Sequence, residues 1–300
     1  MPVIGYLGPE SPQRFASRLG AFREGLAQAG YVEGRNVAME FRWADGQYNQ
    51  LPALAKELAD RQVTVIAAPG GAEVALAAKA ATTTIPIVFE MGGDPIALGV
   101  VDSLSRPKGN ITGVSSLSVE VSRKRLEFLH EARPGNKMFA VVVNPNSPTS
   151  GTQLKNLEIA ADSLGVSLVV LKAGHEQEFD ALFGIAREKG AGGLVFSSDP
   201  YFAFRSQQLA ALAVRHGVPA VTQSRDFPLA GGLMSYGGDF SQSHLNAGIY
   251  CGRILKGEKP SELPVQRVTK LELFINLATA GSLGISVPSS LLSRADHLIE

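Results

Sequence analysis

The sequence VIGYLGPESP at residues 3–12 decides the fold, and the sequence FAVVVNPNSP at residues 139–148 follows the same pattern. Each segment is an apolar run of strand length that ends in x-Pro-x-Ser-Pro. A parallel strand that helices cover on both faces reads as a continuous apolar run. Proline ends the hydrogen-bond ladder of such a strand, and serine can cap the next helix or contact a ligand. The two segments therefore predict two wound halves, each opening with a strand whose carboxyl end carries a rigid polar loop.

Composition and charge describe a folded protein without a dominant electrostatic partner. The chain has 300 residues, of which 45% are hydrophobic and 19% are charged, and 28 basic residues balance 28 acidic ones. This length favours two domains, and the zero net charge excludes a global field that would attract nucleic acid or an anionic membrane. The single cysteine, Cys251, cannot form an internal disulfide. No run approaches the roughly 18 apolar residues that a membrane span requires.

Strand-like and helix-like segments alternate through both halves. Strands are predicted at residues 3–7, 36–42, 63–68, 85–89 and 110–114 of the first half, and at residues 138–143, 167–171, 193–197, 218–221 and 232–236 of the second. Pro86 and Pro219 lead equivalent strands. Strands that alternate with helices through short loops form parallel sheets with right-handed crossovers. The tail predicts a helix at residues 245–255, an extended segment at residues 263–268 and a strand or strand–helix mixture at residues 271–275, and residues 296–300 close the chain.

We therefore expect an α/β fold of two Rossmann-like lobes, each a doubly wound parallel sheet, joined by several crossing segments. Lobe I comprises residues 1–116 and 238–263, and lobe II comprises residues 117–237 and 264–300. Open α/β sheets bind ligands beyond the carboxyl ends of their strands. The loops at these ends are rich in Ser, Asn, Gly and Asp, which orient ligands but are also ordinary residues of loops and helix caps. As a set, they predict a ligand cleft between the lobes.

The sequence carries no recognised signature of an enzyme or a metal site. It contains no phosphate-binding loop, no G-x-G-x-x-G after the first strand, and no pair of histidines at metal-binding spacing. We accordingly expect no catalytic residue, no cofactor and no metal. Cys251 lies in mid-helix, where a small buried hydrophobic role is more common than that of a nucleophile. The basic clusters at residues 123–125 and 253–259 are interpreted as solvated helix faces.

Four carboxylates near strand ends leave two interpretations open. Glu90, Asp94, Asp199 and Asp239 could converge as an acid/base pair, or they could serve as helix caps and as a counter-ion for a ligand. Pro95 directly follows Asp94 and favours the capping role there. Asp239 is our preferred partner for a ligand ammonium group, and capping of the following helix is nearly as good an interpretation.

Several short motifs, taken together, resemble one known family. The motifs are IGYL (4–7), IPIVF (85–89), GGDP (92–95), NITGVS (110–115), NPN (144–146), GGLMSYG (231–237), GRILKGEKP (252–260) and RAD (294–296). In this combination they resemble the substrate-binding proteins of ABC transporters that are related to tryptophan- and tyrosine-binding components. The resemblance runs nearly end to end. It implies a type I periplasmic-binding fold, in which two α/β lobes linked by three crossing segments close on a ligand by hinge motion.

The resemblance also implies which residues contact the ligand. From lobe I these are Pro9, Ser11, Gln13, Gly70 and Gly71, with Ser115 and Ser116 at a crossing; from lobe II they are Asn144, Ser147, Ser197, Asp199 and Ser224, with Tyr236 and Asp239 near the returning crossing. Replacement of Asp199 or Asp239 by alanine is expected to weaken ligand binding without unfolding the protein.

Partners and location follow from the same resemblance. It implies a small-molecule ligand, with an aromatic amino acid or a related aromatic or polar acid favoured, and an ABC permease with its ATPase. It implies no nucleic acid and no membrane span in this chain. Family members normally begin with a signal peptide, which implies a periplasmic or extracytoplasmic location; a chain that is complete as it stands would be cytoplasmic. Two other classes share the architecture, namely an enzyme such as a sugar-nucleotide epimerase and the sensory ligand-binding core of a repressor or receptor.

Overall fold

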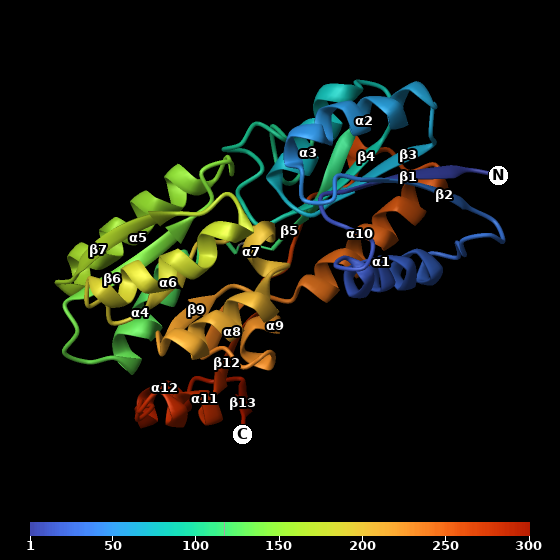
Figure 1. The fold of residues 1–300 in the computed structure, drawn as a ribbon. Coiled ribbons are helices and arrows are strands. Elements are labelled where there is room, and N and C mark those ends of the chain that lie inside the picture. Colours follow the sequence, from blue (N-terminus) through green and yellow to red (C-terminus); the bar gives the residue numbers. More distant parts are fainter. Residues whose placement is uncertain (117) are drawn as a thin grey trace. The chain divides into compact units, whose positions relative to one another are not determined.

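The computed structural model describes residues 1–116 and 118–300, and the chain divides into two compact units. Unit 1 comprises Met1–Leu117 and Asp239–Thr269, and unit 2 comprises Ser118–Gly238 and Lys270–Glu300. Each unit contains one sheet with helices packed against it (Figure 1). The chain passes from one unit to the other at three places, so each unit is built from segments that are distant in the sequence.

Unit 1 contains a parallel sheet of six strands in the order β11-β5-β4-β3-β1-β2. The strands are β1 (Val3–Gly8), β2 (Ala38–Trp43), β3 (Val65–Pro69), β4 (Ile87–Met91), β5 (Ile111–Ser115) and β11 (Gln266–Arg267). The helices are α1 (Ala16–Gln28), α2 (Leu51–Asp60), α3 (Ala72–Ala81) and α10 (Phe240–Leu255), with short turns η1 (Tyr48–Gln50) and η3 (Pro260–Glu262).

Alternation along the strands of unit 1 separates two cores. Leu7 belongs to the core beneath α2 and α3, whereas the neighbouring Tyr6 packs edge-on against Phe22 of α1 on the other face. There α1 and α10 pack against each other through glycine, because a Cβ on Gly25 would lie 1.8 Å from the main-chain oxygen of Leu245. This close approach fixes α10 beside the sheet and positions the candidate residues at its amino-terminal end.

Unit 2 contains a sheet of seven strands in the order β13-β12-β10-β9-β8-β6-β7. The strands are β6 (Met138–Val143), β7 (Ser167–Lys172), β8 (Leu194–Phe196), β9 (Ala220–Thr222), β10 (Met234–Gly238), β12 (Leu271–Asn276) and β13 (His297–Ile299). The helices are α4 (Ser122–Ala132), α5 (Ser150–Leu164), α6 (Phe179–Glu188), α7 (Pro200–Ala203), α8 (Ser206–His216), α9 (Asp226–Leu229), α11 (Leu277–Ser282) and α12 (Ser289–Leu292), with the turn η2 (Glu176–Glu178).

The two sheets repeat one strand order, which confirms the predicted pair of doubly wound α/β folds. In unit 1 the strand order is β2-β1-β3-β4-β5, so the second strand, β2, lies at the edge of the sheet beside the first, β1. In unit 2 the order β7-β6-β8-β9-β10 likewise places the second strand, β7, at the edge beside the first, β6. All of these pairs are parallel. The two opening strands with their x-Pro-x-Ser-Pro loops, β1 and β6, therefore occupy equivalent positions.

The structure departs from the expected pattern in the tail and after β4. Strand β12 runs antiparallel to β10, so the sheet of unit 2 is mixed. Residues 264–269 were expected in the second lobe, but they belong to unit 1 because Gln266 and Arg267 extend the ladder of β5. After β4, Asp94 accepts the N–H of Ile96 at 2.8 Å and caps a turn at residues 95–99, where a helix had been expected to begin.

The expectation of a solvated basic face at residues 123–125 is wrong at one position. Arg123 and Lys124 are exposed, but Arg125 is completely buried. In α4, residues three or four positions apart share a face. Arg125 therefore shares the buried face of Ser122 and Leu129, which points inward.

Candidate functional site

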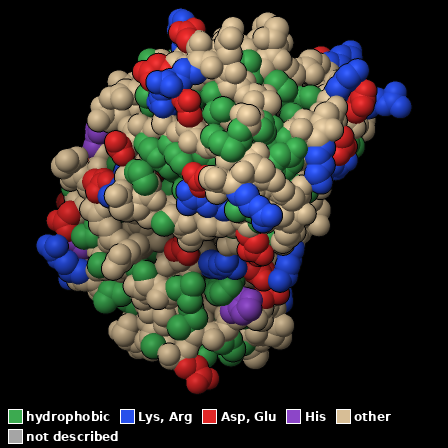
Figure 2. Space-filling view, turned by 90° about the vertical axis from the view of Figure 1, so that its right-hand side faces the viewer, with side chains coloured by type: hydrophobic (Ala, Val, Ile, Leu, Met, Phe, Trp, Pro, Cys, Tyr) green, Lys and Arg blue, Asp and Glu red, His purple; other side chains and the backbone are tan. Residues whose placement is uncertain are grey.

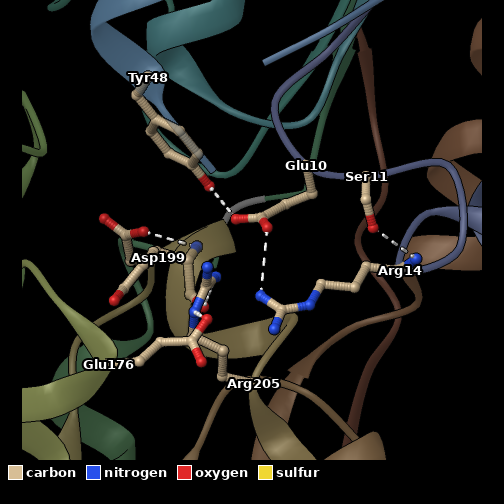
Figure 3. Close-up of polar contacts among 8 residues, drawn as sticks. Glu10, Ser11, Arg14, Tyr48, Glu176, Asp199 and Arg205 are labelled. Atoms are coloured by element: carbon tan, nitrogen blue, oxygen red, sulfur yellow. Dashed lines mark hydrogen bonds and ion pairs between the residues drawn. The ribbon is translucent and has the colours of Figure 1, made fainter. Parts of the chain in front are cut away.

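The loop after β1 carries a buried carboxylate in addition to the residues expected there. Glu10 is 1% exposed; the Tyr48 hydroxyl donates to its Oε1 at 3.1 Å, and Arg14 Nη1 lies 3.5 Å from its Oε2 (Figure 3). Ser11 Oγ accepts the main-chain N–H of Arg14 at 3.4 Å, so this serine caps the turn that leads into α1. Gln13 is exposed. The loop thus combines one capping serine with an anchored acid.

The loops after β3 and β5 meet around the end of β4. The N–H groups of Gly70 and Gly71 both donate to the main-chain oxygen of Glu90, at 3.2 and 3.0 Å. Ser115 Oγ donates to the Gly93 carbonyl at 3.3 Å, and Ser116 is completely buried. Pro9 packs against this group, since a Cβ on Gly70 would lie 2.8 Å from Pro9 Cγ. The structure therefore brings the predicted glycines and serines of unit 1 together on either side of β4.

Glu90 and His244 form a buried pair of titratable groups beneath these loops. Glu90 Oε2 lies 3.9 Å from His244 Nε2, and both side chains are almost fully buried. Burial raises the pKa of Glu90 to about 7, partly offset by Arg18. Burial lowers the pKa of His244 to about 3, and Arg18 lowers it further. Because His244 Nδ1 donates to the Phe240 carbonyl at 2.8 Å, its Nε2 is an acceptor.

Several polar atoms in this part of unit 1 lack a hydrogen bond within the described chain. They are Glu90 Oε1, His244 Nε2 and the hydroxyl of Tyr6. A buried polar atom without a partner is costly, so such a group marks a site under functional or structural constraint. From the sequence alone, Glu90 was one of four carboxylates whose role was left undecided, and His244 was assigned no role. The signal available for Glu90 was a lone acidic residue inside an apolar strand.

Unit 2 gathers three of the predicted residues around one carboxylate. Asp199 is completely buried and caps α7, where its Oδ1 accepts the N–H of Tyr201 at 2.7 Å. Asn144 Nδ2 donates to Oδ2 at 3.3 Å, and the nearby Ser147 hydroxyl lowers the pKa of the carboxylate. Burial raises the pKa of Asp199 to about 6, although these hydrogen bonds and Arg205 oppose the rise. The residues come from the loops after β6 and β8, which are neighbouring strands.

Arg205 beside this carboxylate is itself anchored. Its Nε lies 2.7 Å from Glu176 Oε1 (Figure 3). Its guanidinium also stacks 3.7 Å above the ring of Tyr201. The positive charge is therefore shared with Glu176 while still favouring the ionised form of Asp199.

The main chain beside Asp199 is held by buried side chains. Gln153 Nε2 donates to the Ser198 carbonyl at 2.8 Å, and Gln223 Nε2 donates to the Asp199 carbonyl at 3.0 Å. The hydroxyl of Ser197 is buried and has no hydrogen-bond partner among the residues that the structure describes. Ser197 and Asp199 thus stand on a rigid loop, and one free hydroxyl is available there.

The remaining predicted residues have separate surroundings. Ser224 Oγ donates to Asp226 at 3.1 Å, and the half-buried ring of Tyr236 packs edge-on against Phe128 with centroids 4.9 Å apart. Asp239 lies in unit 1 and caps α10, accepting the N–H groups of Ser241 at 2.9 Å and Gln242 at 3.2 Å. The capping interpretation of Asp239 therefore has direct support, and its contact with a ligand remains a prediction.

Charge and composition of the described residues set limits on other partners. No group of three or more His, Cys, Asp or Glu side chains that could hold a metal ion occurs among residues 1–116 and 118–300. Over the same residues, no helix combines the length and the apolar character needed to span a membrane. On the face in Figure 2, Lys and Arg side chains lie interspersed with Asp and Glu, as the zero net charge suggests.

Two doubly wound sheets whose carboxyl edges carry buried acids, amides and hydroxyls define an α/β binding protein of two units. The chain belongs to the ABC transporter substrate binding protein family, whose model matches residues 10–299. The family that the sequence motifs indicated is thereby confirmed.

Individual proteins are similar to this chain over most of its length. A tyrosine-binding protein of Clostridioides difficile (strain R20291) is 25% identical over 266 residues, which cover 87% of this chain and 75% of that protein. A conserved domain protein from Vibrio cholerae is 26% identical, with a TM-score of 0.90 and 99% of each chain covered. An ABC domain from Streptococcus pneumonia in complex with L-Trp is 22% identical, with a TM-score of 0.89 and 99% of each chain covered.

The fold is the expected type I periplasmic-binding fold. A periplasmic binding protein/LacI transcriptional regulator from Alkaliphilus metalliredigens QYMF shares it at 15% identity, with a TM-score of 0.63 over 91% of this chain and 97% of that one. At such identity the likeness concerns the fold alone, and the function follows from the family.

Proposed function

We propose that this substrate-binding protein captures an aromatic amino acid, or a related aromatic or polar acid, for an ABC importer. The observation that carries the proposal is the buried carboxylate of Asp199 beside the unpartnered hydroxyl of Ser197. The similar proteins named for tyrosine binding and solved with L-Trp support this ligand class. The half-buried ring of Tyr48, beside the loop after β1 in unit 1, supplies a surface suited to such a side chain.

Asp199 is suited to bind the ammonium group of the ligand. Its oxygens accept hydrogen bonds from Asn144 Nδ2 and from the N–H of Tyr201, and a carboxylate offers about four acceptor positions. An ammonium group would supply the charge that burial otherwise leaves poorly compensated. Asn144 and Ser147 hold the carboxylate in place, and Ser197 can donate to or accept from a polar group of the ligand.

The proposed mechanism is binding without chemistry on the ligand. In unit 1, the remaining contacts are assigned to Pro9, Ser11, Gln13, the glycines 70–71 and the serines 115–116; in unit 2, they are assigned to Ser224 and Tyr236, and Asp239 lies at the return to unit 1. A ligand that contacts both units favours a closed form, which a permease with its ATPase can recognise. This role places the protein in the periplasm or another extracytoplasmic location.

Titration calorimetry with L-tyrosine, L-tryptophan and 3-(4-hydroxyphenyl)propionic acid tests the proposal, since the last compound lacks the ammonium group. We expect Asp199→Asn to weaken binding of the amino acids by about 10- to 100-fold, the loss of one hydrogen bond to a charged group. Asparagine also caps helices, so α7 should persist. The acid without an ammonium group should lose much less affinity.

Matched controls separate the ligand contact from capping and from general charge. Asp162→Asn removes an exposed carboxylate of α5 in unit 2 and should leave affinity unchanged. Asp239→Ala tests the second candidate acid. Equal affinity of wild type and Asp199→Asn for L-tyrosine and L-tryptophan would overturn the assignment of Asp199. Mass spectrometry of the ligand after prolonged incubation should recover it unaltered, and any product would favour the enzyme alternative.

A further inference from the structure

Arg125 is a buried cation on a helix whose neighbouring cations face solvent. It is completely buried, whereas Arg123 and Lys124 in the same turn of α4 are exposed. Burial lowers the pKa of Arg125 to about 9, which reflects the cost of removing a charge from water. A hydrophobic side chain at this place would avoid that cost. The contacts of the guanidinium should therefore explain why an arginine is buried here.

The guanidinium joins three segments of unit 2 that are far apart in the sequence. Nη1 donates to the Tyr236 carbonyl at 2.9 Å, and Nη2 donates to the Ser118 carbonyl at 2.9 Å. Nη2 also donates to the hydroxyl of Ser198, which in turn donates to the Ser118 carbonyl at 2.6 Å. Its partners are two carbonyl oxygens and one hydroxyl rather than a carboxylate.

Two of these partners stand where the chain changes unit. Ser118 is the first residue of unit 2 after the chain leaves unit 1, and Tyr236 lies two residues before Gly238, where the chain returns to unit 1. One side chain therefore ties together the unit 2 ends of two of the three connections. The planar, forked guanidinium can reach separate carbonyl oxygens at once, which the single ammonium of lysine does less well.

The third partner links this cluster to the candidate carboxylate. Ser198 directly precedes Asp199, and its main chain is held on the other side by Gln153. A displacement of the loop at residues 197–199 would therefore disturb the hydrogen bonds at Ser118 and Tyr236. The network gives a contiguous path of hydrogen bonds from the loop to both connections.

We propose that Arg125 is a positioning residue for ligand binding, which couples the loop at residues 197–199 to the two connections at Ser118 and Tyr236. This inference rests on the proposed function, because it takes Asp199 as the ligand contact. Arg125 does not touch the ligand in this account. It holds the loop and the connections in one arrangement, so that ligand contact at the loop is transmitted to the points where the chain changes unit.

Hydrogen–deuterium exchange of the ligand-free protein provides the first test. Arg125→Met preserves much of the side-chain volume and removes the charge, and Arg123→Met is the matched control on the exposed face of α4. We expect exchange at residues 118–119, 197–199 and 236–238 to accelerate together by about tenfold or more in Arg125→Met, as loss of hydrogen bonds to a charged group would produce. Arg123→Met should match the wild type. Unchanged exchange in any of the three segments would overturn the coupling.

Binding of L-tyrosine and L-tryptophan provides the second test. Arg125→Met should weaken binding by about tenfold, and Arg125→Lys should restore part of the loss because its ammonium group keeps the charge and can donate to part of the same set of oxygens. A purely structural role would lower the melting temperature of ligand-free protein and leave affinity unchanged, which would also overturn the proposal. Ser198→Ala removes the hydroxyl link while keeping Arg125, so it tests the same coupling if Arg125→Met does not fold.

The two proposals fail in different ways. If the wild type binds neither amino acid nor 3-(4-hydroxyphenyl)propionic acid, the proposed aromatic ligand is wrong, while the exchange of ligand-free protein still decides whether Arg125 couples the three segments. If the wild type binds and Arg125→Met binds equally well, the ligand class stands and the positioning role of Arg125 is refuted.

Discussion

Glu90 and His244 predict a stability profile in which two opposite pH dependences cancel. Burial raises the pKa of Glu90 from 4.5 to about 7 and lowers that of His244 from 6.5 to about 3. The contribution of protonated Glu90 to stability is therefore present below pH 4.5 and is lost as the pH rises through about 7. The contribution of neutral His244 is present above pH 6.5 and is lost as the pH falls through about 3. Between pH 4.5 and 6.5 the two slopes oppose each other, so this pair leaves the free energy of unfolding unchanged.

Replacement of either partner should expose the slope of the other. One pH unit for one proton corresponds to about 1.4 kcal/mol. Between pH 6.5 and 4.5, Glu90→Gln should thus lose about 3 kcal/mol of unfolding free energy relative to the wild type, because only the His244 slope remains. Over the same interval, His244→Gln should gain about 3 kcal/mol relative to the wild type, because only the Glu90 slope remains.

Urea unfolding followed by the fluorescence of Trp43 measures these changes. Trp43 is the only tryptophan of the chain, and it lies in unit 1 with its ring 5.5 Å from that of Tyr6. Asp226→Asn, an exposed change in unit 2, is the control and should track the wild type. Parallel stability profiles for the wild type and both variants between pH 4.5 and 6.5 would refute the reasoning, because they would show no change in proton affinity on folding.

Burial raises the pKa of Asp199 to about 6, and only the ionised carboxylate attracts an ammonium group. When the pH is lowered from one unit above this pKa to one unit below it, the affinity for L-tyrosine should therefore fall about tenfold. Calorimetry measures the change, and an affinity that does not vary with pH would count against this contact. Gly70→Ala should destabilise unit 1 by about 1–3 kcal/mol in urea unfolding, since φ is 119° and the new Cβ would lie 2.8 Å from Pro9 Cγ. Gly30 has a φ of 90°, but a Cβ built there would meet no atom within 4 Å. If Gly30→Ala lowered the free energy of unfolding as much as Gly70→Ala does, the clash with Pro9 could not be the cause of the loss. The thiol of Cys251 should resist a disulfide reagent in the native protein and react in urea, because it is buried and burial raises its pKa; rapid labelling of native protein would disprove this.

Local sequence patterns predicted most of the fold. The apolar runs that became β1 and β6 are buried on both faces. A strand in this environment is a continuous apolar run, so it can be recognised in the sequence without knowledge of its neighbours. Helical spacing similarly indicated α10. The edge strand β11 was assigned to the wrong unit because its two residues carry little pattern, and only its pairing with β5 decides its place.

The candidate site was predicted in outline because loops at strand ends follow from topology. Asn144, Ser147 and Asp199 were expected on such loops, and the structure brings them together, with the Asn144 amide donating to the carboxylate of Asp199. Glu10 was missed although it stands between Pro9 and Ser11, because a surface loop and a buried acid look alike in sequence. Its burial depends on the Tyr48 hydroxyl, which a different loop supplies.

The order of strands and helices, the two wound halves and the family can all be predicted from local features of the chain, because they depend on periodicity, turn residues and motifs within short segments. Only the tertiary structure decided which polar groups are buried and what they bind. Arg125 looked like one of three solvated cations until the carbonyl of Tyr236, 111 residues away in the chain, proved to be its partner. The physical reason is that the cost of burying a charge depends on neighbours brought together by folding, and no local pattern encodes them.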